Sequence, residues 1–415
     1  MWILNEESKL PLYIQLYQQI KADIDCGIIK TGGQLPSSRK LSAELGLSRN
    51  TIELAYSHLC ADGCLASRPR QGYFVEAVLD ARDGQREDLK PKDESARNII
   101  YDFKNKRLGQ ADFPFHTWKI LLNRCLYEHQ SGLLQSGCPF GEMGLRRKIQ
   151  KYLYRHRQVY CDVEQIVVGT GTQFCLELIC QIIKMDGTAA NFQIAMENPG
   201  HAKTRLTFQN NEFRILPTEL DRQGINIKRL STNTPDVVYV TPSHQCPTGI
   251  VMSIERRRQL AEWAIMHQTL IIEDDCNCHF QYNTNPLPSI QSMCSERVVY
   301  LGDFSDVLFP SVGVSYMVLP KHMKSKLCER YCSEASFVPF LTQKTLELFM
   351  SDGHIEKHIR KIVRRQQKKR DLLVFALKSE FGNNLYVSGE TAGLHLLVRA
   401  NWATTEEELV WLAYN

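Results

Sequence analysis

The chain has 415 residues, of which 43% are hydrophobic and 23% charged, with 50 Lys and Arg against 46 Asp and Glu. This length allows two or three domains that each bury a core. The net charge of +4 excludes a positive field over the whole molecule, so any affinity for nucleic acid must be local. The first residues lack a basic and apolar leader, and no apolar run approaches about 18 residues, so we expect a soluble, cytoplasmic protein without membrane contact.

The 14 cysteines are scattered through apolar stretches and lack the repeated pairing of a structural zinc site. We therefore expect reduced thiols and no metal. Only Cys276, Cys278 and His279 lie close enough along the chain to suggest a metal site. Packing is the favoured interpretation of these three residues.

The N-terminal residues show the pattern of three helices and a hairpin. Apolar residues three or four apart predict the first helix. Ser37 or Ser38 can cap a second helix that ends before Gly46, and Ser48 can cap a third. Two short β-type runs follow. The predicted elements are helices at 12–26, 37–45 and 49–62 and strands at 64–67 and 72–75.

A charged segment, residues 79–98, reads LDARDGQREDLKPKDESARN and is too poor in apolar residues to fold alone, so we interpret it as a linker. Beyond it, apolar runs alternate with helical patterns, which favours a parallel or mixed sheet covered by helices. The expected strands are 165–168, 193–196, 237–240, 270–272, 298–301 and 314–318, and a helix at 353–379 precedes a strand in LHLLVRA.

The start of the third predicted helix carries side chains suited to DNA. A helix-turn-helix places the N-terminal end of its second helix in the major groove. Ser48 and Thr51 can donate to phosphate, Asn50 can pair with adenine, and Arg49 can reach guanine or phosphate. Arg68 and Arg70 bracket a turn that could form a wing. For each residue taken alone, an ordinary surface side chain is the favoured interpretation.

Taken together, residues 10 to 76 resemble the GntR superfamily of winged-helix regulators. The segment that carries the resemblance is PLYIQLYQQIKADIDCGIIKTGGQLPSSRKLSAELGLSRNTIELAYSHLCADGCLASRPRQGYFV. The resemblance implies a winged helix-turn-helix domain over residues 1–78 that binds a double-stranded operator. It also assigns DNA contacts to Ser38, Arg39, Ser48, Arg49, Asn50, Thr51, Arg68, Gln71 and Gly72.

Two later segments suggest a site for a phosphate-bearing cofactor. The turn from Gly169 to Gln173 leads from a strand into a helix, where backbone N–H groups can hold phosphate, although many such turns bind nothing. Asp274 follows a buried strand at the edge where open α/β sheets bind ligands, and such an acid can hold a pyridinium nitrogen protonated. It could equally cap a neighbouring helix.

Residues from about 100 to 400 resemble fold type I aminotransferases, and specifically the MocR branch of GntR regulators. The motifs are GEMGLRRKIQKYL, QIVVGTGTQFCLELI, MENPGH, YVTPSHQCPTG, IIEDDCNCHFQY, VVYLGDFSDVLFPSVGVSY and AGLHLLV. The resemblance implies a three-layer α/β domain with a mostly parallel sheet over 99–415, pyridoxal phosphate as cofactor, a homodimer, and a small effector such as an amino compound or vitamer.

The sequence departs from this family at the cofactor site. Asp306 stands where the family has the lysine that forms the Schiff base, and a carboxylate cannot form an imine. Gly313 replaces a phosphate-binding arginine, and His201 and Cys276 replace tyrosines. We expect covalent binding and transamination to be lost, and the same losses put non-covalent binding in doubt. The vestigial cofactor set is Gly171, Thr172, Gln173, His201, Asp274, Cys276, Ser305 and Asp306.

We therefore expect a DNA-binding regulator that is not an enzyme. One alternative is an active aminotransferase with a DNA-binding arm, which would need another lysine, such as Lys321 or Lys324. Another is a regulator whose second domain only dimerises. The family also continues past AGLHLLV with a substrate-carboxylate arginine, whereas this chain stops at Asn415, so we expect the second domain to be C-terminally incomplete.

Overall fold

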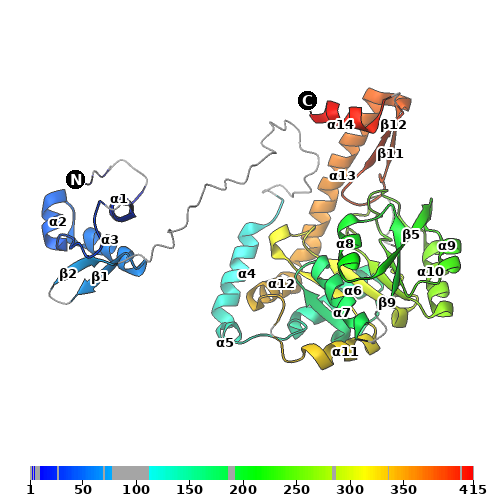
Figure 1. Cartoon of the computed structure of the whole chain (residues 1–415), viewed down its shortest axis with the longest axis horizontal. Helices are drawn as coiled ribbons and strands as arrows, with labels where there is room; N and C mark the ends of the chain where they lie inside the picture. The colour runs from blue at the N-terminus through cyan, green and yellow to red at the C-terminus, as the bar shows by residue number, and fades with distance from the viewer. Residues whose placement is uncertain are drawn as a thin grey trace. The chain divides into compact units, whose positions relative to one another are not determined.

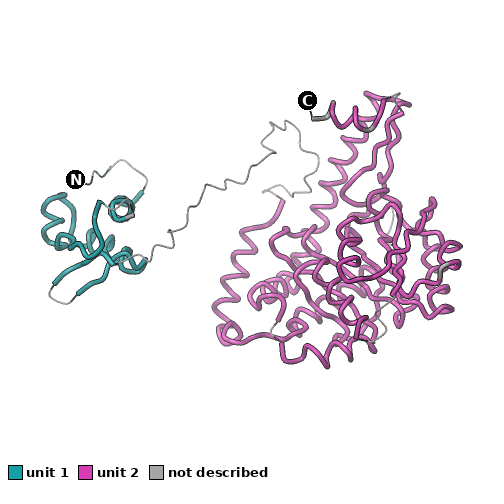
Figure 2. The backbone as a smooth tube through the Cα atoms, viewed as in Figure 1, with its two compact units in different colours: residues 1–100 teal, residues 101–415 magenta. Residues whose placement is uncertain are grey.

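The chain separates into two compact units, residues 1–100 and 101–415, in the computed structural model (Figure 2). The described residues are 2, 4, 10–25, 28–68, 71–76, 112–185, 192–282, 287–334, 336–401 and 404–414. The predicted linker at 79–98 lies outside them, as do the predicted domain boundaries next to it. These boundaries therefore stay predictions.

Unit 1 has the predicted three helices and hairpin. Its elements are α1 (Leu12–Asp25), α2 (Ser38–Leu45), α3 (Arg49–Ala61), β1 (Leu65–Arg68) and β2 (Gly72–Val75). Ser37 caps α2, and Gly46 ends it with a φ of 67°, a conformation that favours glycine. Leu16, Ile20 and Ile52 are fully buried in the core of this unit. The hairpin strands β1 and β2 pair antiparallel.

Unit 2 is built on an eight-stranded mixed sheet in the order β3-β10-β9-β8-β7-β4-β5-β6. Neighbouring strands from β9 to β5 run parallel, whereas β10 is antiparallel to β3 and β9, and β6 is antiparallel to β5. The predicted mostly parallel sheet is therefore confirmed. The strands are β3 (Ile166–Gly169), β4 (Gln193–Asn198), β5 (Arg214–Asp221), β6 (Gly224–Ile225), β7 (Val237–Val240), β8 (Leu270–Asp274), β9 (Val298–Asp303) and β10 (Ser315–Val318).

Helices cover both faces of this sheet (Figure 1). Alternate side chains of each strand point to opposite faces, so Ile194 and Met196 pack with α7 while Ala195 packs with α10. The helices are α4 (Phe115–Glu128), α5 (Gln130–Leu133), α6 (Met143–Arg157), α7 (Thr172–Lys184), α8 (Ala202–Asn210), α9 (Ile227–Asn233), α10 (Ile254–His267), α11 (Lys321–Tyr331), α12 (Phe340–Ser351), α13 (His354–Phe381) and α14 (Glu406–Tyr414).

The long helix α13 agrees with its prediction to within two residues at its C-terminal end. It leads to a small antiparallel pair, β11 (Leu385–Ser388) and β12 (Leu397–Ala400). Only the last four residues of LHLLVRA form the predicted strand. In the described part of the chain, no helix has the length and apolarity needed to cross a membrane.

Candidate functional site

The start of α3 presents the predicted DNA-reading residues at the surface of unit 1. Ser48 caps the helix, and its Oγ accepts from the Thr51 backbone N–H at 3.2 Å and lies 2.8 Å from Thr51 Oγ1. Asn50 is exposed, and exposed Arg49 forms an ion pair with Glu53 at 2.7 Å. An exposed pair of this kind is weak, so phosphate can compete for the guanidinium.

The other predicted contacts lie at the start of α2 and in the hairpin. Exposed Arg39 follows Ser38 in the first turn of α2, but Ser38 is only 9% exposed and is less accessible than the rest. Arg68 lies with its guanidinium 4.7 Å from the centre of the Phe74 ring. Exposed Gln71 follows the undescribed residues 69–70, and Gly72 has a φ of +103°. The structure thus places the predicted residues on three neighbouring elements of the same unit.

In unit 2, residues of the predicted vestigial cofactor set lie at one edge of the sheet. The strands β3, β8 and β9 all end there, and antiparallel β10 begins there. Ser315, at the start of β10, stands opposite Gly169 on one side and Asp303 on the other. Asp274 ends β8, beside β9. This edge is where open α/β sheets bind ligands.

The turn before α7 is already hydrogen-bonded to neighbours within the chain. The Gly171 N–H donates to Ser315 Oγ at 2.9 Å. The Thr172 hydroxyl donates to Asp303 Oδ2 at 3.4 Å and lies 3.3 Å from Cys276 Sγ. Gln173, the third predicted residue of this turn, is exposed. Two donors that a phosphate would need are therefore engaged by a hydroxyl and a carboxylate.

Asp274 is held by a chain of hydrogen bonds. The Tyr239 hydroxyl donates to Asp274 Oδ2 at 2.5 Å, and Thr204 Oγ1 lies 3.5 Å from the Tyr239 hydroxyl. His201 caps α8, and its Nδ1 lies 2.9 Å from Thr204 Oγ1. The structure thus connects two predicted residues, His201 and Asp274, through two that the sequence did not indicate.

Three carboxylates gather at this edge: Asp274, Asp303 and Asp306. Asp303 is largely buried, and its carboxylate accepts from the backbone N–H of the predicted residue Ser305. Burial, together with the nearby Asp306 and Asp274, raises the pKa of Asp303 to about 6. Asp306 is partly buried in the turn after β9.

The residues present do not fit pyridoxal phosphate. The cofactor would bring an anionic phosphate to an edge that already holds three carboxylates. Among the described residues, no Lys or Arg side chain forms an ion pair or hydrogen bond with Thr172, Asp274 or Asp303. At Gly313 a Cβ would meet no atom within 4 Å, so the turn has space for a side chain but supplies no cation.

The two lysines considered as replacements are engaged elsewhere. Lys321 forms an ion pair with Asp162 at 2.9 Å. Lys324 donates to Cys328 Sγ at 3.2 Å, and its Nζ lies 3.0 Å from the centre of the Phe140 ring. Neither contact brings an amine to the carboxylates.

A buried ion pair supports the same edge from within, and the sequence analysis did not predict it. Arg157 donates to both oxygens of Asp275, at 2.6 and 3.1 Å, and both side chains are almost fully buried. The Tyr300 hydroxyl also donates to Asp275, at 2.6 Å. The partners lie 118 residues apart in the chain, and no local pattern could have indicated the pair.

The cysteine-rich segment after β8 does not form a compact ligand set. Cys276 contacts Thr172, whereas His279 Nδ1 lies 2.8 Å from the Tyr152 hydroxyl. Burial lowers the pKa of His279 to about 4. The thirteen cysteines of the described part are free thiols, and this part contains no group of three His, Cys, Asp or Glu arranged to hold a metal ion.

Comparison with known proteins agrees with this two-unit architecture. Residues 12–75 match the family of bacterial regulatory proteins of the gntR type, and residues 107–410 match aminotransferase class I and II. In fold, unit 2 resembles a multiple substrate aminotransferase from Thermococcus profundus, with a TM-score of 0.66 and 22% identity over 75% of this chain and 78% of that one.

Two regulators match along nearly the whole chain. The HTH-type transcriptional regulator YdeL of Bacillus subtilis is 35% identical over 98% of this chain and 88% of its own length. The probable rhizopine catabolism regulatory protein MocR of Rhizobium meliloti is 28% identical over 100% of this chain and 86% of its own length. The chain therefore belongs to the MocR-type transcription regulators, in which a GntR helix-turn-helix domain is joined to an aminotransferase-like domain.

Proposed function

We propose that this regulator binds its operator through the start of α3, the start of α2 and the β1–β2 hairpin, and that unit 2 dimerises and senses a small molecule without catalysing transamination. The exposed cap of α3 supports the DNA-binding half of the proposal, because its hydroxyl, amide and guanidinium groups suit phosphates and base edges.

The gathering of Asp274, Asp303 and Asp306 carries the non-catalytic half of the proposal. A Schiff base needs an amine, and Asp306 supplies a carboxylate at the position where the family has its lysine. Burial first, and the neighbouring Asp306 and Asp274 in addition, raise the pKa of Asp303. A cationic amino compound would suit this edge better than a phosphate, so we infer that the effector is an amine. The effector would bind one conformation of the regulator better than another, and so would change the fraction of molecules whose geometry suits the operator.

Absorbance and thermal shift with pyridoxal phosphate test the loss of covalent binding. We expect the wild type to show neither a Schiff-base absorption band nor stabilisation. Asp306→Lys restores an amine and should gain the absorption band or the thermal stabilisation. Asp306→Asn removes the charge without supplying an amine and serves as the matched control, which should gain no band.

A Schiff-base absorption band in the wild type would contradict the proposal. It would favour the alternative that the chain is an active aminotransferase. In that case, borohydride reduction and peptide mapping would identify the lysine that reacts. A band in the Asp306→Asn variant would show that another amine reaches the site once the charge is removed.

A further inference from the structure

The positive charge of this chain is concentrated on one helix. From Lys357 to Arg370, α13 carries eight Lys and Arg residues and no Asp or Glu. The whole chain has a net charge of only +4, so its remaining residues together have an excess of four acidic groups. The helix therefore stands out from an otherwise slightly acidic molecule.

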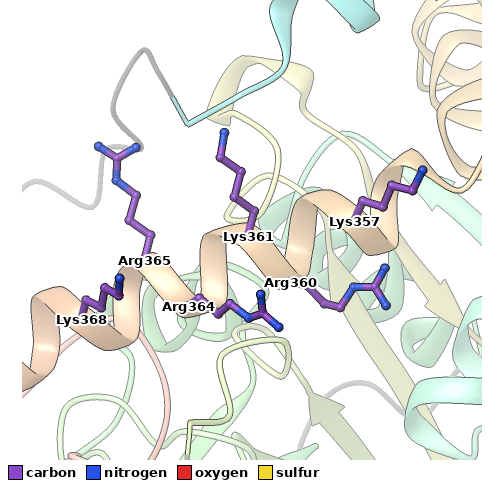
Figure 3. A pocket seen from close by; sticks show the side chains of 6 residues that line it. All are labelled: Lys357, Arg360, Lys361, Arg364, Arg365 and Lys368. Atoms are coloured by element: carbon purple, nitrogen blue, oxygen red, sulfur yellow. The ribbon is translucent and has the colours of Figure 1, made fainter.

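Six of these cations form two rows along α13. Residues four apart lie on the same side of a helix, so Lys357, Lys361 and Arg365 form one row (Figure 3). The second row starts at Arg360 and Arg364, which Figure 3 shows pointing to another side of the helix, and ends at Lys368. At a rise of 1.5 Å per residue, the two rows extend over about 17 Å. We call these six residues the basic stripe.

The stripe is exposed, and few of its residues form ion pairs with the described acids. All six residues are exposed. Within the described part of the chain, only Arg365 of the six forms an ion pair, with Asp112. Cations four residues apart on a helix repel one another. On α13 only Glu356, four residues before Arg360, and Asp371, three residues after Lys368, stand at a spacing that can offset this repulsion, so most of the stripe lacks a neighbouring negative charge on its own helix. An external polyanion would supply it.

We propose that the basic stripe binds the phosphate backbone of the DNA duplex that unit 1 recognises. This inference rests on the proposed DNA-binding function of unit 1. DNA carries one negative charge per about 1.7 Å of its axis, so the length of the stripe faces about ten phosphate charges. The covalent connection between the units also keeps a duplex held by unit 1 at high effective concentration near unit 2.

The extended shape of the stripe favours a polymer over a small anion. A small anion binds where a few donors converge, whereas these side chains point outward in separate rows along several turns. Lys and Arg that contact phosphates position a protein on DNA but read no sequence. The stripe therefore adds affinity and orientation, and sequence recognition stays with unit 1.

Salt-dependent binding of the full chain to a labelled random-sequence duplex of about 40 base pairs tests this proposal. The stripe variant is Lys357→Gln/Lys361→Gln/Lys368→Gln, which keeps helix-forming side chains. The matched control, Lys203→Gln/Arg222→Gln/Lys228→Gln, removes three exposed cations from other parts of unit 2. A third variant, Arg49→Ala/Arg68→Ala, removes contacts proposed for unit 1.

We expect the stripe variant to bind roughly tenfold more weakly at moderate salt, with a slope of log affinity against log salt that is shallower by about 2 to 3. The control variant should match the wild type. A charge-preserving variant, Lys357→Arg/Lys361→Arg/Lys368→Arg, should retain wild-type binding. Thermal unfolding checks that all variants are folded.

Equal affinities and slopes for the stripe and control variants would overturn the inference. If the stripe variant weakens binding while Arg49→Ala/Arg68→Ala does not, the stripe binds DNA but the role proposed for unit 1 fails. If the wild type binds no duplex at all, both proposals fail.

Discussion

Asp303 ends β9 beside two other carboxylates, and its ionisation therefore works against folding. Burial and these neighbours raise its pKa from 3.8 to about 6, so the folded chain holds a proton there more tightly than the unfolded chain. The stability from this proton is fully present below about pH 4 and is lost as the pH rises through about 6.

We predict that Asp303→Asn, which cannot ionise, is more stable than the wild type at neutral pH. The free energy of unfolding should increase by on the order of 1–2 kcal/mol, and the difference should shrink as the pH falls toward 4. Urea unfolding at several pH values measures this. A variant less stable than the wild type at neutral pH would contradict the view that burial and the neighbouring carboxylates oppose the ionisation of Asp303.

Asp221→Asn is a control that should change the stability at neutral pH in the opposite direction. Burial raises the pKa of Asp221, but its hydrogen bond from Arg256 at 2.7 Å lowers that pKa overall. The stability from this carboxylate is present above its unfolded pKa, so its removal should destabilise the chain at neutral pH.

At the residue scale, the sequence indicated Thr172 and Asp274 because they lie at the ends of strands or in the turns that follow them, and the family resemblance added Cys276. It did not indicate Asp303, although this residue also ends a strand, because the family motif in this turn singles out Asp306 three residues later. Tyr239 lies inside an apolar run and looks like a core residue until its hydroxyl is seen beside Asp274. Such partners, 35 residues apart, come together only through the parallel sheet.

At the scale of elements, the cap of α3 has two separable roles. Ser48 Oγ accepts from the Thr51 N–H and so stabilises the first turn of the helix. The same hydroxyl lies where the proposal places DNA phosphate. Ala removes both roles, whereas Asp is as good a cap as Ser but adds a negative charge.

We predict that Ser48→Ala destabilises unit 1 by about 1 kcal/mol. Ser48→Asp should keep the stability of unit 1 but lose roughly tenfold or more in affinity for a random-sequence duplex, because the carboxylate repels phosphate. Thermal unfolding and fluorescence anisotropy measure the two effects. Wild-type affinity in Ser48→Asp would place the DNA away from this cap.

Elements with a clear apolar period were predictable from the sequence, and those without one were not. The fully buried strands β3, β7 and β10 lie within one residue of their predicted bounds. The eight-residue strand β5 was not predicted, because Pro217 and charged residues interrupt it and only Thr218 is buried along its length. The sheet supplies its backbone partners, which local sequence cannot reveal.

At the scale of the whole molecule, each buried apolar cluster takes its residues from a single unit. One cluster contains only residues of unit 1, including Ile52, and the other three contain only residues of unit 2, including Ile149. Unfolding enthalpy scales with chain length, at about 0.7 kcal/mol per residue. Unit 2 should therefore unfold with several times the enthalpy of unit 1.

We predict two transitions in scanning calorimetry, which Ile52→Ala and Ile149→Ala assign to the two units. Each variant removes a fully buried side chain and should cost about 2–5 kcal/mol in its own unit while leaving the other transition in place. The clusters that the described residues form are separate, so Ile149→Ala leaves the buried core beneath the DNA-reading residues of unit 1 intact. Ile149→Ala should thus leave DNA affinity unchanged below its transition. A single transition that both variants shift together would instead show that the two units fold as one.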